Sequence, residues 1–307
     1  MRFNRLDLNL LVALDAMLTE RNVSRSADRM HMTQSAMSNA LNRLRGYFDD
    51  DLLVPMGRGM ELTPRAEFLR SAVRDVLVRI EASITTKPMF DPAHSDRKFR
   101  IFVSDYTMGT LIPHMLALAH RQSKSVRFDL LPQVAQPQRA LEQGEADLLI
   151  IPTDFCSPDH PAENLFSERF LCIAWSEGRY ATGPLTLDDY GRAGHVIMQP
   201  PGGAPSFETS TIRRLGIERR TEVSTFSFAG IPPLIVGTDR LATVHAQIAG
   251  QASLNLPLAV HEPPFEIPAM QQAMQWHRHR TQDPGLIWLR ELLAASAEKM
   301  MSASVRH

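Results

Sequence analysis

The sequence predicts an α/β protein that begins with a helix–turn–helix and a β-hairpin, continues through one long linker helix and ends in two small α/β lobes. Apolar residues recur at helical spacing through the first ninety residues, and no helix breaker appears between Thr63-Pro64 and about Thr86. From Lys98 onward, short apolar runs alternate with helical stretches, which is typical of buried strands in an α/β sheet. At 307 residues, the chain has room for two or three domains.

The composition predicts a globular chain of a reducing compartment. Hydrophobic residues make up 44% and charged residues 22%, and no apolar run approaches the roughly 20 residues that a membrane-spanning helix needs. Asp7, Asn9 and Asp15 interrupt the apolar start, so it does not read as a secretion signal. Cys156 and Cys172 are too few for a disulfide framework. We therefore expect a cytoplasmic location and no membrane partner.

The charge is unevenly distributed although the net charge is only −1. Residues 1–90 carry 13 Lys and Arg against 11 Asp and Glu. Between Arg21 and Arg45 lie five arginines and a single acid, Asp28. A local basic patch of this kind is typical of a surface that contacts phosphates, although solvated helix faces can look similar.

Three short helices are predicted before residue 50. Asp7 is placed to cap the first, Ser24 to cap a second over about Arg25–Met30, and Thr33 to cap a third that runs to about Tyr47. The third helix has an apolar stripe at spacings of four, three and four, made of Met37, Leu41, Leu44 and Phe48. Its opposite face is polar and carries Ser35, Asn39, Asn42 and Arg43, with Ser38 at the edge.

The polar face of the third helix has the chemistry of a DNA-reading helix. Such a helix needs short polar groups and guanidinium groups that reach base edges and phosphates. Arg58, at the tip of the predicted hairpin between Gly57 and Gly59, suits a phosphate or minor-groove contact. The alternative is an ordinary three-helix cluster with a solvated polar face.

The helix that begins at Thr63-Pro64 is predicted to form a dimer. An N-cap threonine followed by proline at the first helical position is a helix start. Its apolar residues again step by four, three and four, as in the seam of a two-stranded coiled coil: Leu69, Val73, Val76 and Ile80. No other burial site is evident for this stripe, so we expect it to pack against a second copy of the helix.

The rest of the chain is predicted to form parallel sheets in two lobes. The apolar runs FRIFVSD, VRFDLLP, DLLIIP and RFLCIAWS are separated by helical stretches at Leu111–Arg121 and Pro137–Gln143. A helix follows from about Ser206 to Gly216, and another lies near Leu286–Met300. His277 and His279 share one face of a predicted strand but lack a third ligand, so we expect no metal site.

Residues 6–64, LDLNLLVALDAMLTE to MELTP, resemble the winged helix–turn–helix of LysR-type transcriptional regulators. The nodulation and aromatic-catabolism branch is the most similar, through LDLNLLVALDA, FDP at 90–92 and IVGTDRLATVHAQIA at 235–249. The resemblance implies a winged helix–turn–helix over 1–62, a linker helix over 63–90 and an effector-binding domain over 91–307. That domain would have two Rossmann-like lobes of the periplasmic-binding-protein type II, one over about 91–166 and 270–307 and the other over about 167–269.

The resemblance also implies residues for DNA contact and a set of partners. The DNA-contacting residues would be Ser24, Arg25, Thr33, Gln34, Ser35, Ala36, Ser38, Asn39, Asn42 and Arg43, with Arg58 in the wing. Arg45 departs from the common pattern, in which an acidic residue follows the leucine. The partners would be double-stranded DNA with an interrupted palindromic operator, a second copy in a homodimer or homotetramer, and RNA polymerase.

The family's effector lies between the lobes, and the matching positions are Ser104, Asp105, Tyr106, Thr107, Met108, Pro152, Thr153, Phe155, Met198, Gly202, Phe226, Phe228, Ile231 and His245. Loops at the carboxyl ends of parallel strands, with a helix N-terminus among them, bind small molecules well. These segments contain no Lys or Arg, and Asp105 is their one acid. A dicarboxylate would demand arginine partners, so we expect an aromatic, phenolic effector that phenylalanines enclose.

Two other classes of protein fit the lobes alone. A transporter's solute-binding protein would need an export signal and would lack the first ninety residues. A diverged enzyme would need catalytic residues, and the sequence has no G-x-S-x-G, phosphate loop or G-x-G-x-x-G. We expect a transcriptional activator that uses no catalytic residue, metal or cofactor.

Overall fold

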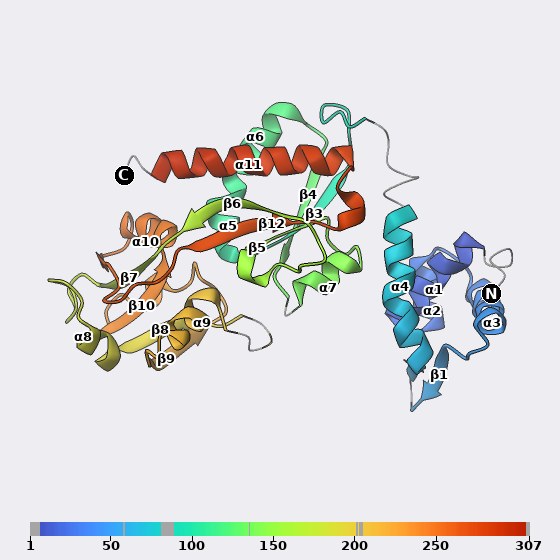
Figure 1. Ribbon diagram of the computed structural model, residues 1–307, viewed down its shortest axis with the longest axis horizontal. Helices are drawn as coiled ribbons and strands as arrows, with labels where there is room; N and C mark the ends of the chain where they lie inside the picture. The colour runs from blue at the N-terminus through green and yellow to red at the C-terminus, as the bar shows by residue number, and fades with distance from the viewer. Residues whose placement is uncertain are drawn as a thin grey trace. The chain divides into compact units, whose positions relative to one another are not determined.

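The computed structural model describes residues 7–57, 59–80, 89–134, 136–200, 202 and 205–304 (Figure 1). The chain divides into two compact units. One is Met1–Thr86 with Glu142–Gly144, and the other is Lys87–Leu141 with Glu145–His307. Within the described ranges, no helix is both long and apolar enough to cross a membrane.

The N-terminal unit contains the predicted helix–turn–helix, a hairpin and a long helix. Its elements are α1 (Leu8–Glu20), α2 (Val23–Arg29), α3 (Gln34–Phe48), β1 (Leu53–Met56), β2 (Gly59–Leu62) and α4 (Pro64–Ile80). β1 and β2 pair antiparallel. Side chains cap three of these helices as the sequence predicts: Asp7 accepts from the Asn9 N–H (2.9 Å), Thr33 from Ala36 (3.2 Å) and Thr63 from Ala66 (3.1 Å).

The predicted cap of the second helix is wrong. α2 begins at Val23, and the side chain of Asn22 accepts a hydrogen bond from the Arg25 N–H at 2.9 Å. Asn22 has an extended backbone and is as good a cap as serine, so it starts the helix two residues earlier than predicted. Ser24 lies inside the helix and is exposed.

The core of the N-terminal unit also takes in part of the apolar stripe of α4. Leu14, Met17 and Met37 are fully buried there, and Val73 (5% exposed) and Leu69 pack against the same cluster. α4 is tied to α1 by an ion pair between Arg74 Nη1 and Asp15 Oδ2 (2.6 Å). The prediction that this stripe has no burial site within one chain is therefore wrong for Leu69 and Val73.

The C-terminal unit contains two five-stranded sheets, each forming one lobe. Lobe I has the strand order β4-β3-β5-β12-β6: β4 (Arg127–Pro132), β3 (Lys98–Val103), β5 (Leu148–Pro152), β12 (Met270–Gln275) and β6 (Ala162–Glu168). Lobe II has the order β11-β7-β10-β8-β9: β11 (Leu258–His261), β7 (Phe170–Trp175), β10 (Arg240–His245), β8 (Gly194–Met198) and β9 (Arg220–Thr225).

Both sheets are mixed, which corrects the prediction of parallel sheets. β3 pairs parallel with β4 and β5, and β8 pairs parallel with β9 and β10. β12 runs antiparallel to β5 and β6, and β7 runs antiparallel to β10 and β11. The chain passes between the lobes twice, at Arg169 between β6 and β7 and again between β11 and β12.

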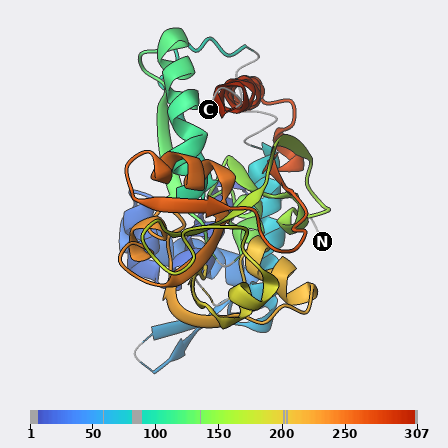
Figure 2. The same cartoon turned by 90° about the vertical axis from the view of Figure 1, so that its left-hand side faces the viewer.

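Helices cover both sheets. Lobe I carries α5 (Asp105–Thr110), α6 (Ile112–Gln122), α7 (Pro137–Glu142) and α11 (Pro284–Ser304), and lobe II carries α8 (Leu187–Arg192), α9 (Phe207–Arg214) and α10 (Ala246–Ser253). α11 packs beside α6, as the end-on view of α11 in Figure 2 shows. Among the described residues of this unit, short 3₁₀ turns lie at Thr153–Phe155, Pro232–Leu234 and Arg278–Arg280. The last contains His279 and is preceded by His277, where a strand was predicted.

Candidate functional sites: an exposed recognition helix and a pocket between two lobes

α3 presents a polar face to solvent in the N-terminal unit. Its stripe Met37, Leu41 and Leu44 is buried, which turns the opposite face outward. Among the residues predicted to contact DNA, eight are exposed: Ser24, Arg25, Thr33, Gln34, Ser35, Asn39, Asn42 and Arg43. Ala36 and Ser38 are half-buried at the edges of this face, and Arg58 lies outside the described residues. The face therefore offers hydroxyl, amide and guanidinium groups on one helix, as major-groove recognition requires.

Arg45, the departure noted in the sequence, has a structural role. Its Nε donates to the Asp51 carbonyl oxygen and its Nη2 to the Leu53 carbonyl oxygen, both at 2.8 Å. These bonds join the last turn of α3 to the chain that enters the hairpin. Arg45 thus holds the start of the hairpin against α3.

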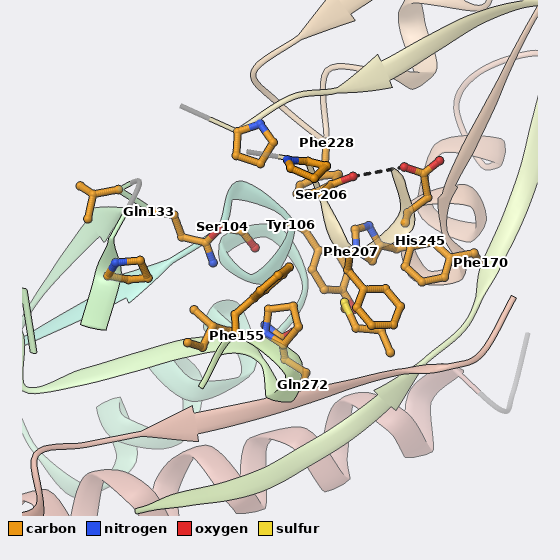
Figure 3. Close-up of a pocket in the computed structure, with 18 of the residues that line it drawn as sticks. Ser104, Tyr106, Gln133, Phe155, Phe170, Ser206, Phe207, Phe228, His245 and Gln272 are labelled. Carbon is orange, nitrogen blue, oxygen red and sulfur yellow. Dashed lines mark hydrogen bonds between the residues drawn. The ribbon is translucent and has the colours of Figure 1, made fainter. Parts of the chain in front are cut away.

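A pocket lies between lobes I and II of the C-terminal unit and encloses about 160 Å³ of free space (Figure 3). Lobe I contributes residues at the carboxyl ends of β3, β4 and β5 together with β12, among them Ser104, Gln133, Pro152 and Gln272. Lobe II contributes the start of α9, the chain after β9 and the end of β10, and so brings in Phe207, Phe228 and His245. This is the position expected for ligands of open α/β sheets.

The start of α5 is fixed by hydrogen bonds. Ser104 caps the helix by accepting from the Thr107 N–H at 3.1 Å. The Tyr106 hydroxyl donates to Glu168, which ends β6 at the passage between the lobes. Burial raises the pKa of the Glu168 carboxyl. Burial also raises the pKa of the Tyr106 hydroxyl, and the negative charge of Glu168 raises it further. The phenol of Tyr106 therefore keeps its proton.

His245 is enclosed by aromatic rings. It stacks on Tyr106 with ring centroids 3.9 Å apart and planes at 9°, and Phe228 meets it edge-on at 4.7 Å. Phe170 approaches at 5.0 Å. Burial lowers the pKa of His245 to about 3, because the charged imidazolium would lose its solvation. His245 is therefore a neutral imidazole at physiological pH.

The described wall of the pocket offers no positively charged side chain to a ligand. Among the described residues that line it, only Glu208 is formally charged. Its carboxylate pairs with the buried guanidinium of Arg219 and accepts hydrogen bonds from Ser206 Oγ (3.2 Å) and Thr209 Oγ1 (2.8 Å). The negative charge is thus satisfied from within lobe II, and the other described side chains of the wall are aromatic, aliphatic, amide or hydroxyl.

The structure brings six of the fourteen residues predicted for the effector site into the pocket wall: Ser104, Tyr106, Pro152, Phe155, Phe228 and His245. Of the others, Met108 is 49% exposed and Phe226 is 82% exposed, so neither side chain helps to enclose a ligand. Thr107, Met198 and Ile231 are buried within the lobes, and Thr153 and Gly202 lie outside the wall. The carboxylate of Asp105 is occupied by Ser227 and Ala229 of lobe II.

Sequence reasoning missed several residues of the wall. Gln133 follows β4, so the rule that points to carboxyl ends of strands would have found it. Phe170, Met270 and Gln272 lie on strands that were not recognised as neighbours of the site. Phe207 and Glu208 are the first residues of α9, whose start near Ser206 the sequence predicts without indicating that it lies in the pocket wall.

The fold and the two candidate sites are those of a ligand-responsive DNA-binding protein, with an N-terminal helix–turn–helix and a small-molecule pocket between the two α/β lobes of the C-terminal unit. Residues 8–67 match the bacterial regulatory helix-turn-helix of the lysR family, and residues 92–298 match the LysR substrate binding domain. The chain belongs to the LysR family of transcriptional regulators, which are DNA-binding proteins and not enzymes.

Curated relatives match over nearly the whole chain. Nodulation protein D 2 of Rhizobium leguminosarum bv. phaseoli is 41% identical over 99% of this chain and 96% of its own length. Nodulation protein D 1 of Bradyrhizobium japonicum is 40% identical over 98% and 94%. The chain is thus similar to nodulation protein D along its full extent.

Solved structures show the same fold. A probable transcriptional regulator from Pseudomonas aeruginosa has a TM-score of 0.65 at 27% identity, covering 95% of this chain and 99% of that one. Full-length CbnR in complex with its target DNA has a TM-score of 0.59 at 16% identity, covering 95% and 100%.

Proposed function

We propose that this regulator activates transcription when an uncharged aromatic molecule occupies the pocket between its lobes. The lining carries the proposal: aromatic, proline and aliphatic side chains make up most of the wall, a few amide and hydroxyl groups lie among them, and no lysine or arginine belongs to its described part. A dicarboxylate needs bidentate guanidinium partners to offset its desolvation, whereas a phenolic ring needs apolar faces and a few hydrogen bonds.

The relatives support the aromatic assignment. The chain is similar to proteins named nodulation protein D, and the resemblance to that branch implies phenolic effectors such as flavonoids, chlorophenols or hydroquinones. Six predicted contacts that line the pocket are proposed as effector-binding residues: Ser104, Tyr106, Pro152, Phe155, Phe228 and His245.

On the DNA side, we infer that α3 reads the major groove through its exposed polar face. Two copies would present two such helices to an interrupted palindromic operator, as a homodimer or homotetramer. Effector binding shifts an equilibrium between arrangements of lobes or subunits and so changes the spacing of the paired recognition helices. Contact with RNA polymerase and a cytoplasmic location belong to the same proposal.

Calorimetric titration of the full chain against a panel of phenols and a panel of aliphatic di-acids tests the effector class. We expect heat of binding with phenols only, and operator binding in a gel-shift assay that changes when a binding phenol is added. Binding of the di-acids alone would contradict the assignment. Phe228→Ala should weaken phenol binding, because it removes the ring that meets His245 edge-on.

A further inference from the structure

Two buried polar atoms in the pocket wall have no hydrogen-bond partner among the residues that the structure describes: His245 Nδ1 and Gln272 Oε1. Leaving such an atom unpaired costs about 1–3 kcal/mol, so an unpaired buried group calls for an explanation. These two lie in one pocket and come from opposite lobes, His245 from the end of β10 and Gln272 from β12. A bound molecule that pairs with both would satisfy them together.

Gln272 offers an acceptor to the pocket. It is 1% exposed, and its Nε2 donates to Thr107 Oγ1 at 3.2 Å. Thr107 Oγ1 in turn lies 3.0 Å from Ser104 Oγ, so the amide nitrogen is held by a hydroxyl network at the start of α5. The atom that remains is the carbonyl oxygen Oε1, which can only accept. The register of β12 with β6 shifts beside Gln272, an irregularity of the kind that reorients side chains near binding sites.

His245 offers a neutral nitrogen. It precedes α10, yet its side chain makes no capping bond to that helix. The ring is instead fixed between Tyr106, Phe170 and Phe228, which leaves little freedom to turn toward another partner. A neutral imidazole has one N–H and one lone pair, so Nδ1 can pair with a hydroxyl or a carbonyl group of a ligand.

The charge around these atoms selects against anions. A carbonyl oxygen repels a phenolate or a carboxylate. The one charged side chain of the described lining, Glu208, is paired with Arg219, so that pair brings no net positive charge to the wall. No guanidinium or ammonium group of the described lining opposes that repulsion. The partner that suits Gln272 Oε1 is therefore an O–H or N–H donor on an uncharged molecule.

We propose that the effector is an un-ionised, hydroxylated aromatic molecule whose hydroxyl donates to Gln272 Oε1 while a second polar atom pairs with His245 Nδ1. The inference rests on the proposed function and deepens it, because it names the protonation state of the ligand and the two residues that determine specificity. The ligand bridges the two lobes through these bonds. Ionising its hydroxyl removes the proton that Gln272 requires.

Three probes that share one ring system test the proposal: 4-phenylphenol, 4-methoxybiphenyl and biphenyl-4-carboxylate, each titrated at pH 7 into the full chain. We expect 4-phenylphenol to bind about ten-fold more tightly than the methoxy compound, which corresponds to about 1.4 kcal/mol and matches one hydrogen bond. The carboxylate should bind more weakly than both. Gln272→Met should remove the preference for the hydroxyl. A fourth probe, 4,4′-dihydroxybiphenyl, carries the second polar atom that His245 requires. His245→Phe, which keeps a stacked ring, should weaken binding of this probe several-fold and binding of 4-phenylphenol much less.

Gln271→Met is the matched control. Gln271 is the neighbouring residue on β12, is exposed, and donates its Nε2 to Ser167 Oγ at 3.0 Å outside the pocket wall. This variant should keep the ten-fold preference. If Gln272→Met lowers the Tm strongly, the comparison of the three probes on the unaltered chain decides by itself.

The outcomes separate the two proposals. Equal affinity for the hydroxyl and methoxy compounds would overturn the role of Gln272 but leave an aromatic effector in place. Tightest binding of the carboxylate would overturn the selection for uncharged ligands. Binding by none of the three would contradict the aromatic effector itself, and with it the inference that rests on it.

Discussion

Asp105, the first residue of α5 in lobe I, accepts a hydrogen bond from the Ser227 hydroxyl of lobe II, with Oδ2 and Oγ 2.7 Å apart. The same oxygen accepts from the Ala229 N–H at 3.0 Å. Ser227 and Ala229 flank Phe228, which lines the pocket. The Asp105 carboxylate of lobe I therefore holds the lobe II loop that places the Phe228 ring in the pocket wall.

Removing this contact should weaken effector binding. Hydrogen bonds to a charged group contribute about 1.5–3 kcal/mol each, so Asp105→Ala should release the loop that carries Phe228 from lobe I and raise the apparent Kd for 4-phenylphenol at least ten-fold. Asp105→Asn keeps one acceptor and should fall between wild type and alanine. The exposed Asp159→Ala is the control. Unchanged calorimetric affinity in Asp105→Ala would show that the contact does not hold the lobes for binding.

Replacing Arg43 or Arg45 of α3 with alanine should affect different properties of the protein. Arg43 is exposed on the polar face, so Arg43→Ala should cost about 1–3 kcal/mol of operator affinity and relax discrimination at one base pair. Arg45 donates to the carbonyl oxygens of Asp51 and Leu53, so Arg45→Ala should lower the Tm of the N-terminal unit. Binding-site selection and thermal unfolding measure the two effects. Equal operator affinity in wild type and Arg43→Ala would show that α3 does not read the operator.

Replacing Arg58 of the predicted wing should change the overall strength of DNA binding and its salt dependence. Arg58→Ala should weaken binding across all sequences and flatten its salt dependence, because a phosphate contact carries no base preference. Gel-shift titrations at several salt concentrations measure that slope. A loss confined to one operator sequence would indicate a base contact instead.

Local signals predicted the helices well. Caps such as Thr33 and Thr63, and apolar stripes such as Met37–Leu41–Leu44, depend on residues three or four apart, and these fixed spacings are visible in the sequence. The error at α2 arose because Asn22 and Ser24 are both good caps and only the backbone conformation distinguishes them.

Contacts between distant segments were predicted less well. Gln272 reaches the pocket only because β12 returns antiparallel between β5 and β6, and the sequence of MQQAMQ carries no sign of that pairing. Phe226 and Phe228 look alike in sequence, yet one is 82% exposed and the other meets His245. Which phenylalanine faces the pocket depends on the conformation of the loop between β9 and β10 in lobe II, and residue spacing in the sequence does not predict that conformation.

The exposed face of α4 predicts the contact between subunits. Val73 is buried within its own chain, so an aspartate there would unfold the N-terminal unit and would not test the dimer. Phe68, Ala72 and Val76 instead form an exposed stripe at four-residue spacing, with Phe68 78% and Val76 43% exposed. Phe68→Asp with Val76→Asp should lower the sedimenting mass and abolish operator binding together.

The hairpin supplies the control for that experiment. Met56 is also an exposed apolar residue, at 61%, and Met56→Asp should leave the oligomer intact. Undiminished mass in the Phe68 and Val76 double variant would mean that the C-terminal lobes hold the assembly and that α4 is a spacer.

Acid should destabilise the C-terminal unit through its buried histidines. Burial lowers the pKa of His195 to about 4, against an unfolded value near 6.5, and His195 Nε2 lies 2.7 Å from the Tyr190 carbonyl oxygen. The unfolded chain binds the extra proton first, so this stability is complete above pH 6.5 and is lost as the pH falls toward 4, at about 1.4 kcal/mol per pH unit. Burial raises the pKa of Glu168, and this shift stabilises the folded protein as the pH falls, so the test compares variants with wild type.

His195→Gln keeps a donor for the Tyr190 carbonyl oxygen. It should flatten the dependence of the free energy of unfolding on pH between 6.5 and 4.5, as measured by denaturant titration, whereas the exposed His120→Gln should not. Parallel profiles for wild type and His195→Gln would show that the folded protein protonates His195 as readily as the unfolded chain does.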